Sequence, residues 1–157
     1  MGKHFSYCAK NVRPLSQNFR PSGVMAAFQT LLLASYNSSP KAHLFTLPRT
    51  GTTLLTQDLC VKAYYIHKVK NKIDADNISK PLWDAFNGQI YKDDRQLKYL
   101  ETLKVDISTV GSCEFDITNI DDYDLHDLVD FLFNPASTDD QLLYLEVSDL
   151  DLKKVRL

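Results

Sequence analysis

Hydrophobic and polar residues alternate along several short stretches of the chain, which is typical of strands with one buried face. These stretches are residues 3–9, 59–67, 96–107, 113–117 and 142–147. Other stretches repeat apolar residues at helical spacing. They are residues 24–32, the residues before Asn87-Gly88, and residues 121–133. This mixture predicts an α+β domain, with a mixed sheet and helices packed on it.

The second predicted helix is followed by a tight connection that carries two adjacent acids. The helix ends at Asn87-Gly88, where glycine suits a helix stop. Pro81 fits a helix only near its first turn, so we expect the helix to start shortly before it. The connection holds Asp93 and Asp94 and leads into the strand predicted for residues 96–107.

Composition narrows the class of protein. The chain has 157 residues, of which 44% are hydrophobic and 24% charged, enough for one domain with its own core. The longest apolar stretch, Val24–Ala34, is interrupted by polar residues and too short for a membrane span of about 20 residues. The N-terminus lacks the pattern of a secretory signal. The three cysteines, at positions 8, 60 and 113, fit free thiols in a reducing cytosol.

Charge is unevenly distributed along the chain. Residues 1–61 contain six Lys or Arg and one Asp, and residues 62–104 contain nine bases and six acids. Residues 105–157 contain three bases and 13 acids. Such asymmetry suits a nucleic-acid surface beside an acidic segment. The alternative is that folding brings the two signs together on a mixed surface.

The acidic last third suggests a division into two parts. We expect a main domain over residues 1–118 and an acidic helix-strand extension over residues 119–157. The pairs Asp122/Asp124 and Asp149/Asp151 are interpreted as solvated surface. The extension could cover the DNA-binding face, or it could dock a protein partner or widen a dimer interface.

A different set of acids lies in the basic part of the chain. Asp74 and Asp76 are two residues apart, so they point the same way in an extended segment. If the following helix and its return connection bring Asp93 or Asp94 back to them, three or four carboxylates share one pocket. Such a pocket needs a cation, and carboxylate oxygens with open water positions suit Mg²⁺ or Mn²⁺.

The spacing in this region resembles that of the RusA family of Holliday junction resolvases. The matching residues are Asp74-x-Asp76-Asn77-x-x-Lys80, then Asp84-Ala85-Phe86-Asn87-Gly88, then Asp93-Asp94-Arg95-Gln96. Pro14-Leu15-Ser16-Gln17-Asn18 is similar to the N-terminal loop of the family, with Leu15 in place of a proline. The resemblance covers roughly residues 3–117, and Ile73 replaces a frequent proline.

The resemblance implies a homodimeric, Mg²⁺-dependent endonuclease that cuts four-way DNA junctions symmetrically, in recombination and repair. The metal-binding acids of the family correspond to Asp74, Asp76 and Asp94, with Asp93 in support. The essential lysine corresponds to Lys80, which could neutralise charge on a phosphate or simply form an ion pair along the helix. Such an enzyme is expected in the cytoplasm, associated with the nucleoid.

Basic residues near these motifs are candidates for phosphate contacts. They are Arg13, Arg20, Lys68, Lys70, Lys72, Lys92, Arg95 and Lys98. Two alternatives to a junction resolvase remain open on the sequence. One is a metal nuclease that acts on flaps, forks or other branched DNA, and the other is a catalytically silent protein that binds junctions.

Overall fold

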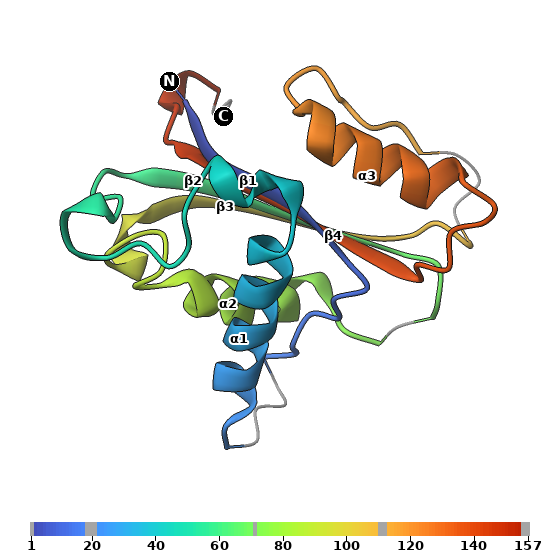
Figure 1. The fold of residues 1–157 in the computed structure, drawn as a ribbon, viewed down its shortest axis with the longest axis horizontal. Coiled ribbons are helices and arrows are strands. Elements are labelled where there is room, and N and C mark those ends of the chain that lie inside the picture. The colour runs from blue at the N-terminus through green and yellow to red at the C-terminus, as the bar shows by residue number, and fades with distance from the viewer. Residues whose placement is uncertain (1, 18–21, 71, 110–112, 155–157) are drawn as a thin grey trace.

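The computed structural model describes residues 2–17, 22–70, 72–109 and 113–154. Its centre is one four-stranded mixed sheet with the strand order β1-β4-β2-β3 (Figure 1). The strands are β1 (Lys3–Lys10), β2 (Leu59–His67), β3 (Leu97–Asp106) and β4 (Gln141–Asp149). β4 runs antiparallel to both β1 and β2, whereas β2 and β3 are parallel. The α+β fold with a mixed sheet is therefore confirmed.

The acidic C-terminal third supplies an inner strand of the sheet. Residues 141–149 pair along their length with β1 on one side and β2 on the other. The helix and the strand expected in this segment are α3 and β4, and a domain boundary after residue 118 stays a prediction. Removal of residues 119–157 would take out β4 and leave β1 without a partner strand.

The strand predicted for residues 113–117 is not formed. Among the described residues β3 pairs with β2 alone, so this segment does not add to β3 as a partner strand. The segment instead runs irregularly over the sheet, where Phe115 packs against a cluster around Ile66 and Phe131. The turn expected at Gly111-Ser112 lies outside the described residues.

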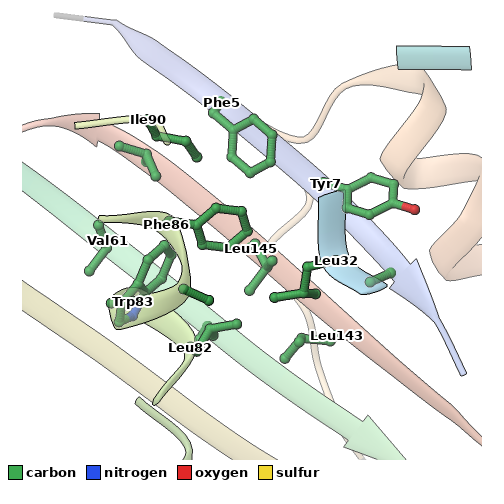
Figure 2. Close-up of a cluster of buried hydrophobic side chains, with 14 of the residues drawn as sticks. Phe5, Tyr7, Leu32, Val61, Leu82, Trp83, Phe86, Ile90, Leu143 and Leu145 are labelled. Atoms are coloured by element: carbon green, nitrogen blue, oxygen red, sulfur yellow. The ribbon is translucent and has the colours of Figure 1, made fainter. Parts of the chain in front are cut away.

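Helices cover both faces of the sheet. α1 (Val24–Asn37) and α2 (Ala75–Phe86) lie on one face, and α3 (Asp122–Phe133) lies on the other (Figure 1). The larger core lies between the sheet and the first two helices, where side chains of β1, β2 and β4 meet those of α1 and α2 (Figure 2). Trp83 is 2% exposed in this core, so it packs inside the protein and does not stack on DNA.

Ion pairs join the basic N-terminal segment to the acidic C-terminal third. Lys3 lies 3.4 Å from Glu146, Lys10 lies 3.0 Å from Asp127, and Lys41 lies 2.7 Å from Asp124. Folding therefore mixes the two signs of charge in this part of the molecule, as the alternative interpretation of the charge pattern requires.

Two simpler expectations can be compared with the structure. Cys8, Cys60 and Cys113 are free thiols. In the part of the chain that the structure describes, none of the helices combines the length and the apolar character that crossing a membrane demands.

Candidate functional site

The first pair of predicted site residues lies at the N-terminus of α2. Asp74 is the N-cap residue and Asp76 lies in the first turn, where the positive end of the helix dipole favours negative charge. The Asp74 carboxylate makes no capping hydrogen bond, and its main-chain carbonyl accepts from the Asn77 N–H at 3.0 Å. Both carboxylates are exposed, while the preceding Ile73 is buried and anchors the chain to the core. The pair is held in place with its oxygens open to solvent.

Pro81 connects this helix to the N-terminal loop. It lies in the middle of α2, not in its first turn, and is buried. Because proline has no N–H, the Asn77 carbonyl, four residues earlier, lacks its usual partner in the helix. The Gln17 N–H donates to that carbonyl at 3.0 Å. The loop that resembles the family's N-terminal motif is thus attached to the helix directly behind Asp76.

Lys80 pairs with a carboxylate that the sequence analysis had not assigned. Its Nζ donates to Asp84 Oδ1 at 3.1 Å and to Oδ2 at 3.2 Å, one helical turn beyond Lys80. The Lys80 side chain is 58% exposed, so this ion pair adds at most about 1 kcal/mol to the free energy of unfolding. The weak pair leaves the ammonium free to exchange partners. The signal for Asp84 was its spacing of four residues from Lys80.

The second pair of acids lies in the connection between α2 and β3. Asp93 caps the short 3₁₀ helix Asp94–Gln96 (η3) and accepts hydrogen bonds from the Arg95 main chain at 2.9 Å and from its guanidinium at 2.6 Å. These bonds from Arg95 lower the pKa of Asp93 well below its usual value. The negative charge of Asp93 is therefore already balanced by Arg95, whereas Asp94 is exposed to solvent.

Gln96 fixes this connection to the rest of the domain. Its buried side chain donates to the Leu55 and Gln57 carbonyls, at 2.9 Å each. Its Oε1 accepts from the main-chain N–H groups of Lys92 and Asp93 at 3.0 and 2.8 Å. The Asp-Asp-x-Gln motif is thus a positioning device that holds Asp94 at the start of β3.

The fold places the two acid pairs at opposite ends of α2. β2 and β3 are parallel, so the helix that connects them runs back along the sheet from the end of β2 to the start of β3 (Figure 1). A helix of 12 residues is about 18 Å long. The expected convergence of Asp93 or Asp94 with Asp74 and Asp76 inside one chain is therefore not found.

Asp84 and Asp94 both influence the buried Tyr91. Burial raises the pKa of the Tyr91 hydroxyl, and the charges of Asp84 and Asp94 raise it further. Tyr91 in turn donates a hydrogen bond to the Trp83 carbonyl, near the C-terminal end of the helix. The charges of both Asp84 and Asp94 therefore act on Tyr91, near the C-terminal end of α2.

The residues at the start of α2 suit a hard divalent cation. Mg²⁺ is commonly held by one or two carboxylates together with water and substrate phosphate oxygens. Asp74 and Asp76 provide such a set. Among the described residues, no group of three or more His, Cys, Asp or Glu side chains is placed to hold a metal ion. One chain therefore presents two carboxylates for a metal, with further ligands to come from outside it.

Most of the candidate DNA contacts are exposed and fall into two groups. Lys70 and Lys72 precede Asp74, whereas Lys92, Arg95 and Lys98 flank Asp94. Arg13 is exposed on the N-terminal loop, and Arg20 lies outside the described residues.

Lys68 differs from the other candidate contacts. Its Nζ donates to the Phe131 carbonyl at 2.6 Å and lies 4.3 Å from the centre of the Phe131 ring. Its ammonium is thus used inside the protein, under α3.

The architecture defines an α+β protein whose parallel β-α-β unit carries acidic residues at both ends of one helix. A comparison with protein families matches residues 46–111 to the family model of the endodeoxyribonuclease RusA. The match contains β2, α2, β3 and all of the predicted acids, and it confirms the resemblance to the RusA family. It supports, in general terms, an endonuclease that acts on Holliday junctions. The comparison with curated proteins gave no match.

Proposed function

We propose that the chain is a Mg²⁺-dependent endodeoxyribonuclease that resolves four-way DNA junctions by paired, symmetric nicks, with Mn²⁺ as an alternative metal. The observation that carries the proposal is the position of Asp74 and Asp76, exposed at the start of α2 within the segment that matches RusA. The proposed setting is recombination and repair of DNA in the cytoplasm, at the nucleoid.

Each of the candidate residues has a separate role in the proposed cleavage reaction. Asp74 and Asp76 would hold the metal, which would lower the pKa of a water and stabilise the leaving oxygen. Lys80, one turn beyond Asp76, moves from Asp84 to the scissile phosphate and neutralises the charge that develops there. Asp93 acts as a positioning residue, because its bonds with Arg95 shape the turn that presents Asp94.

The proposed enzyme is a homodimer. Asp94 lies too far from Asp74 and Asp76 of its own chain to share an ion with them, so we propose that it completes the site of a second copy. A two-fold dimer also carries two sites related in the same way as the two strands cut in a four-way junction. Binding is driven by Lys70, Lys72, Lys92 and Lys98 on the phosphates and therefore weakens as salt is raised.

The test is cleavage of a panel of labelled DNA structures, comprising a four-way junction, a flap, a fork and a linear duplex, with and without Mg²⁺. The wild type is expected to make paired nicks in the four-way junction only when Mg²⁺ is present. Asp76→Asn should bind the junction without cutting it, and Asp122→Asn, an exposed acid in the first turn of α3, serves as the matched control.

Other outcomes of the panel separate the alternatives. Cleavage confined to flaps or forks would show a different branched-DNA nuclease. Junction binding with no cleavage by the wild type in Mg²⁺ or Mn²⁺ would show a silent binding protein. Equal cleavage by the wild type and Asp76→Asn would overturn the assignment of the site.

A further inference from the structure

α3 leaves part of the sheet face on which it lies uncovered. It packs over one end of this face, where Ile66 of β2 lies in a small cluster with Phe131 of the helix. Farther along β2, the residues on the opposite face are buried under α1 and α2, whereas those on the α3 face are only half-buried. The half-buried residues are Cys60, Lys62 and Tyr64.

The uncovered part of this face is hollowed into a groove that follows β2, the β2 groove. Two cavities of about 320 and 210 Å³ lie next to each other, since both are lined by Lys62 and Glu146. The larger reaches Ile66 and the smaller reaches Cys60. At about 3.3 Å per residue, the groove is about 20 Å long, which is the length of about six residues of extended chain.

The floor of the β2 groove carries polar side chains that are paired across the strands. Lys62 lies opposite Glu101 of β3 on one side and Glu146 of β4 on the other. Tyr64 donates a hydrogen bond to Glu101, and Tyr144 donates one to Glu146 at 2.6 Å. Burial and, after it, the bond to the glutamate raise the pKa of each tyrosine. Both tyrosines therefore keep their protons and direct them at the glutamates.

The groove consequently presents acceptors and negative charge. Each tyrosine oxygen and the remaining lone pairs of the glutamates can accept further hydrogen bonds. Among the described residues, Lys62 is the one base that lines the two cavities, and Lys3 reaches in to within 3.4 Å of Glu146. The acids outnumber these bases. They are Glu101, Glu114, Asp116, Glu146, Asp149 and Asp151.

Apolar side chains distinguish the β2 groove from an ordinary acidic surface. Phe115 and Ile120 line the larger cavity, and Leu103, which also lines it, is 40% exposed. Tyr99 lines the smaller cavity and is 40% exposed as well. Arginine suits this mixture, because its guanidinium has only donors, forms paired hydrogen bonds with a carboxylate and stacks on aromatic rings.

We propose that the β2 groove binds an extended, arginine-containing segment of a partner protein. Charge favours such a segment over a nucleic acid, whose phosphates would meet Glu101 and Glu146. α2, which carries Asp74 and Asp76, lies on the opposite face of the sheet (Figure 1). The groove is therefore separate from the proposed nuclease site, and the inference goes beyond the proposed function.

The first test measures binding of a fluorescently labelled peptide, in which three arginines alternate with three leucines, to the full chain. Glu101→Gln/Glu146→Gln removes two charges from the floor but keeps oxygens that accept from the tyrosines, so it should fold. The dissociation constant, from fluorescence anisotropy, should rise at least about tenfold for this variant. The matched control, Asp122→Asn/Asp140→Asn, removes two exposed acids outside the groove and should change it less than about twofold.

The second test locates the peptide on the wild type, so it does not depend on the folding of a variant. The peptide should shift the amide NMR signals of residues 60–66 and 144–148 and leave those of residues 75–86 in α2 unchanged. A peptide with glutamate in place of arginine should shift neither set. Shifts of the same residues that grow with protein concentration, without peptide, would show a second copy in the groove and overturn the proposal.

Other outcomes would also overturn it. Equal weakening by the two double variants would show a general attraction to an acidic chain. Absence of binding by the wild type at about 1 mM peptide, or amide shifts confined to other parts of the molecule, would show that the groove takes no such segment. Neither test uses DNA or Mg²⁺, so this proposal and the proposed nuclease activity fail separately.

Discussion

Two Asp-x-Asp pairs begin helices in this protein, and the fold treats them in opposite ways. Asp74 and Asp76 at the start of α2 are exposed, whereas Asp124 at the start of α3 is completely buried. Each helix has an aspartate as its N-cap, Asp74 in α2 and Asp121 in α3, and carries further aspartate in its first turn. The pattern along the chain therefore cannot decide whether such a pair binds a ligand or stabilises the fold.

The difference comes from a lysine far away in the sequence. Lys41 is 5% exposed, and its Nζ donates to Asp124 at 2.7 Å and to Ser6 at 2.9 Å. It also bonds to Asp121, and although partial burial opposes the change, the bond from Lys41 lowers the pKa of Asp121. Burial raises the pKa of Asp124, and the bonds from Lys41 and Ser6 limit that rise. The acids of α3 thus fasten that helix to β1 and are satisfied within the protein.

The largest effect is expected for Asp76→Asn, which should abolish cleavage while leaving the free energy of unfolding almost unchanged. Asp76→Asn should reduce junction cleavage more than about 100-fold, because loss of an outer-shell partner of a metal already costs 10–100-fold. Its free energy of unfolding should stay within about 0.5 kcal/mol of the wild type, since the side chain is exposed. Cleavage rates and urea denaturation of the same preparation check both parts. A variant that lost stability but still cut DNA would reverse the roles assigned to the two pairs.

The opposite result is expected at Lys41. Lys41→Met leaves Asp124 buried without its counter-charge and should lower the free energy of unfolding by about 3–5 kcal/mol, measured by urea denaturation. Lys10→Met, which removes a more exposed pair with Asp127, should cost at most about 1 kcal/mol. Combining Lys41→Met with Asp124→Asn should recover part of the loss. Equal losses for the two single variants would show that the buried pair has no special role.

The sequence predicts those parts of the fold that depend on the hydrophobic pattern of neighbouring residues. The strand at residues 59–67 and the helices before Gly88 and after Asp121 are found as predicted. The place of Asp94 required knowing that β2 and β3 are parallel, which no local pattern reveals. The burial of Asp124 required Lys41, which lies in the short 3₁₀ helix Pro40–His43, far from Asp124 in the sequence. Both depend on which distant segments pair in the sheet.

A smaller effect is expected from the basic residues beside Asp74. Lys72→Ala should weaken junction binding and reduce the slope of log affinity against log salt by about 1, if Lys72 contacts one phosphate. Lys68→Ala is the matched control, because that ammonium donates to the Phe131 carbonyl. Its slope should equal that of the wild type. Fluorescence anisotropy over a series of salt concentrations measures both, and a change of slope for Lys68→Ala alone would contradict this division.

The smallest effect concerns stability in acid. Hydrogen bonds from His4 and Gln57 lower the pKa of Asp149 to about 2. The group is ionised more readily in the folded state, so its contribution is present above the unfolded pKa of about 4 and is lost as the pH falls towards 2. His4→Gln should flatten this part of the curve of unfolding free energy against pH. Identical curves for the two proteins between pH 4 and 2 would show that the pair contributes nothing.

The central claim is that Asp94 of one chain completes the site formed by Asp74 and Asp76 of another, and a mixing experiment tests it directly. Asp76→Asn and Asp94→Asn should each be inactive alone. A mixed dimer has one site with both changes and one with neither, so nicking of the four-way junction should reappear when the two variants are combined. A mixture that forms mixed dimers and stays as inactive as its components would contradict a site shared between chains.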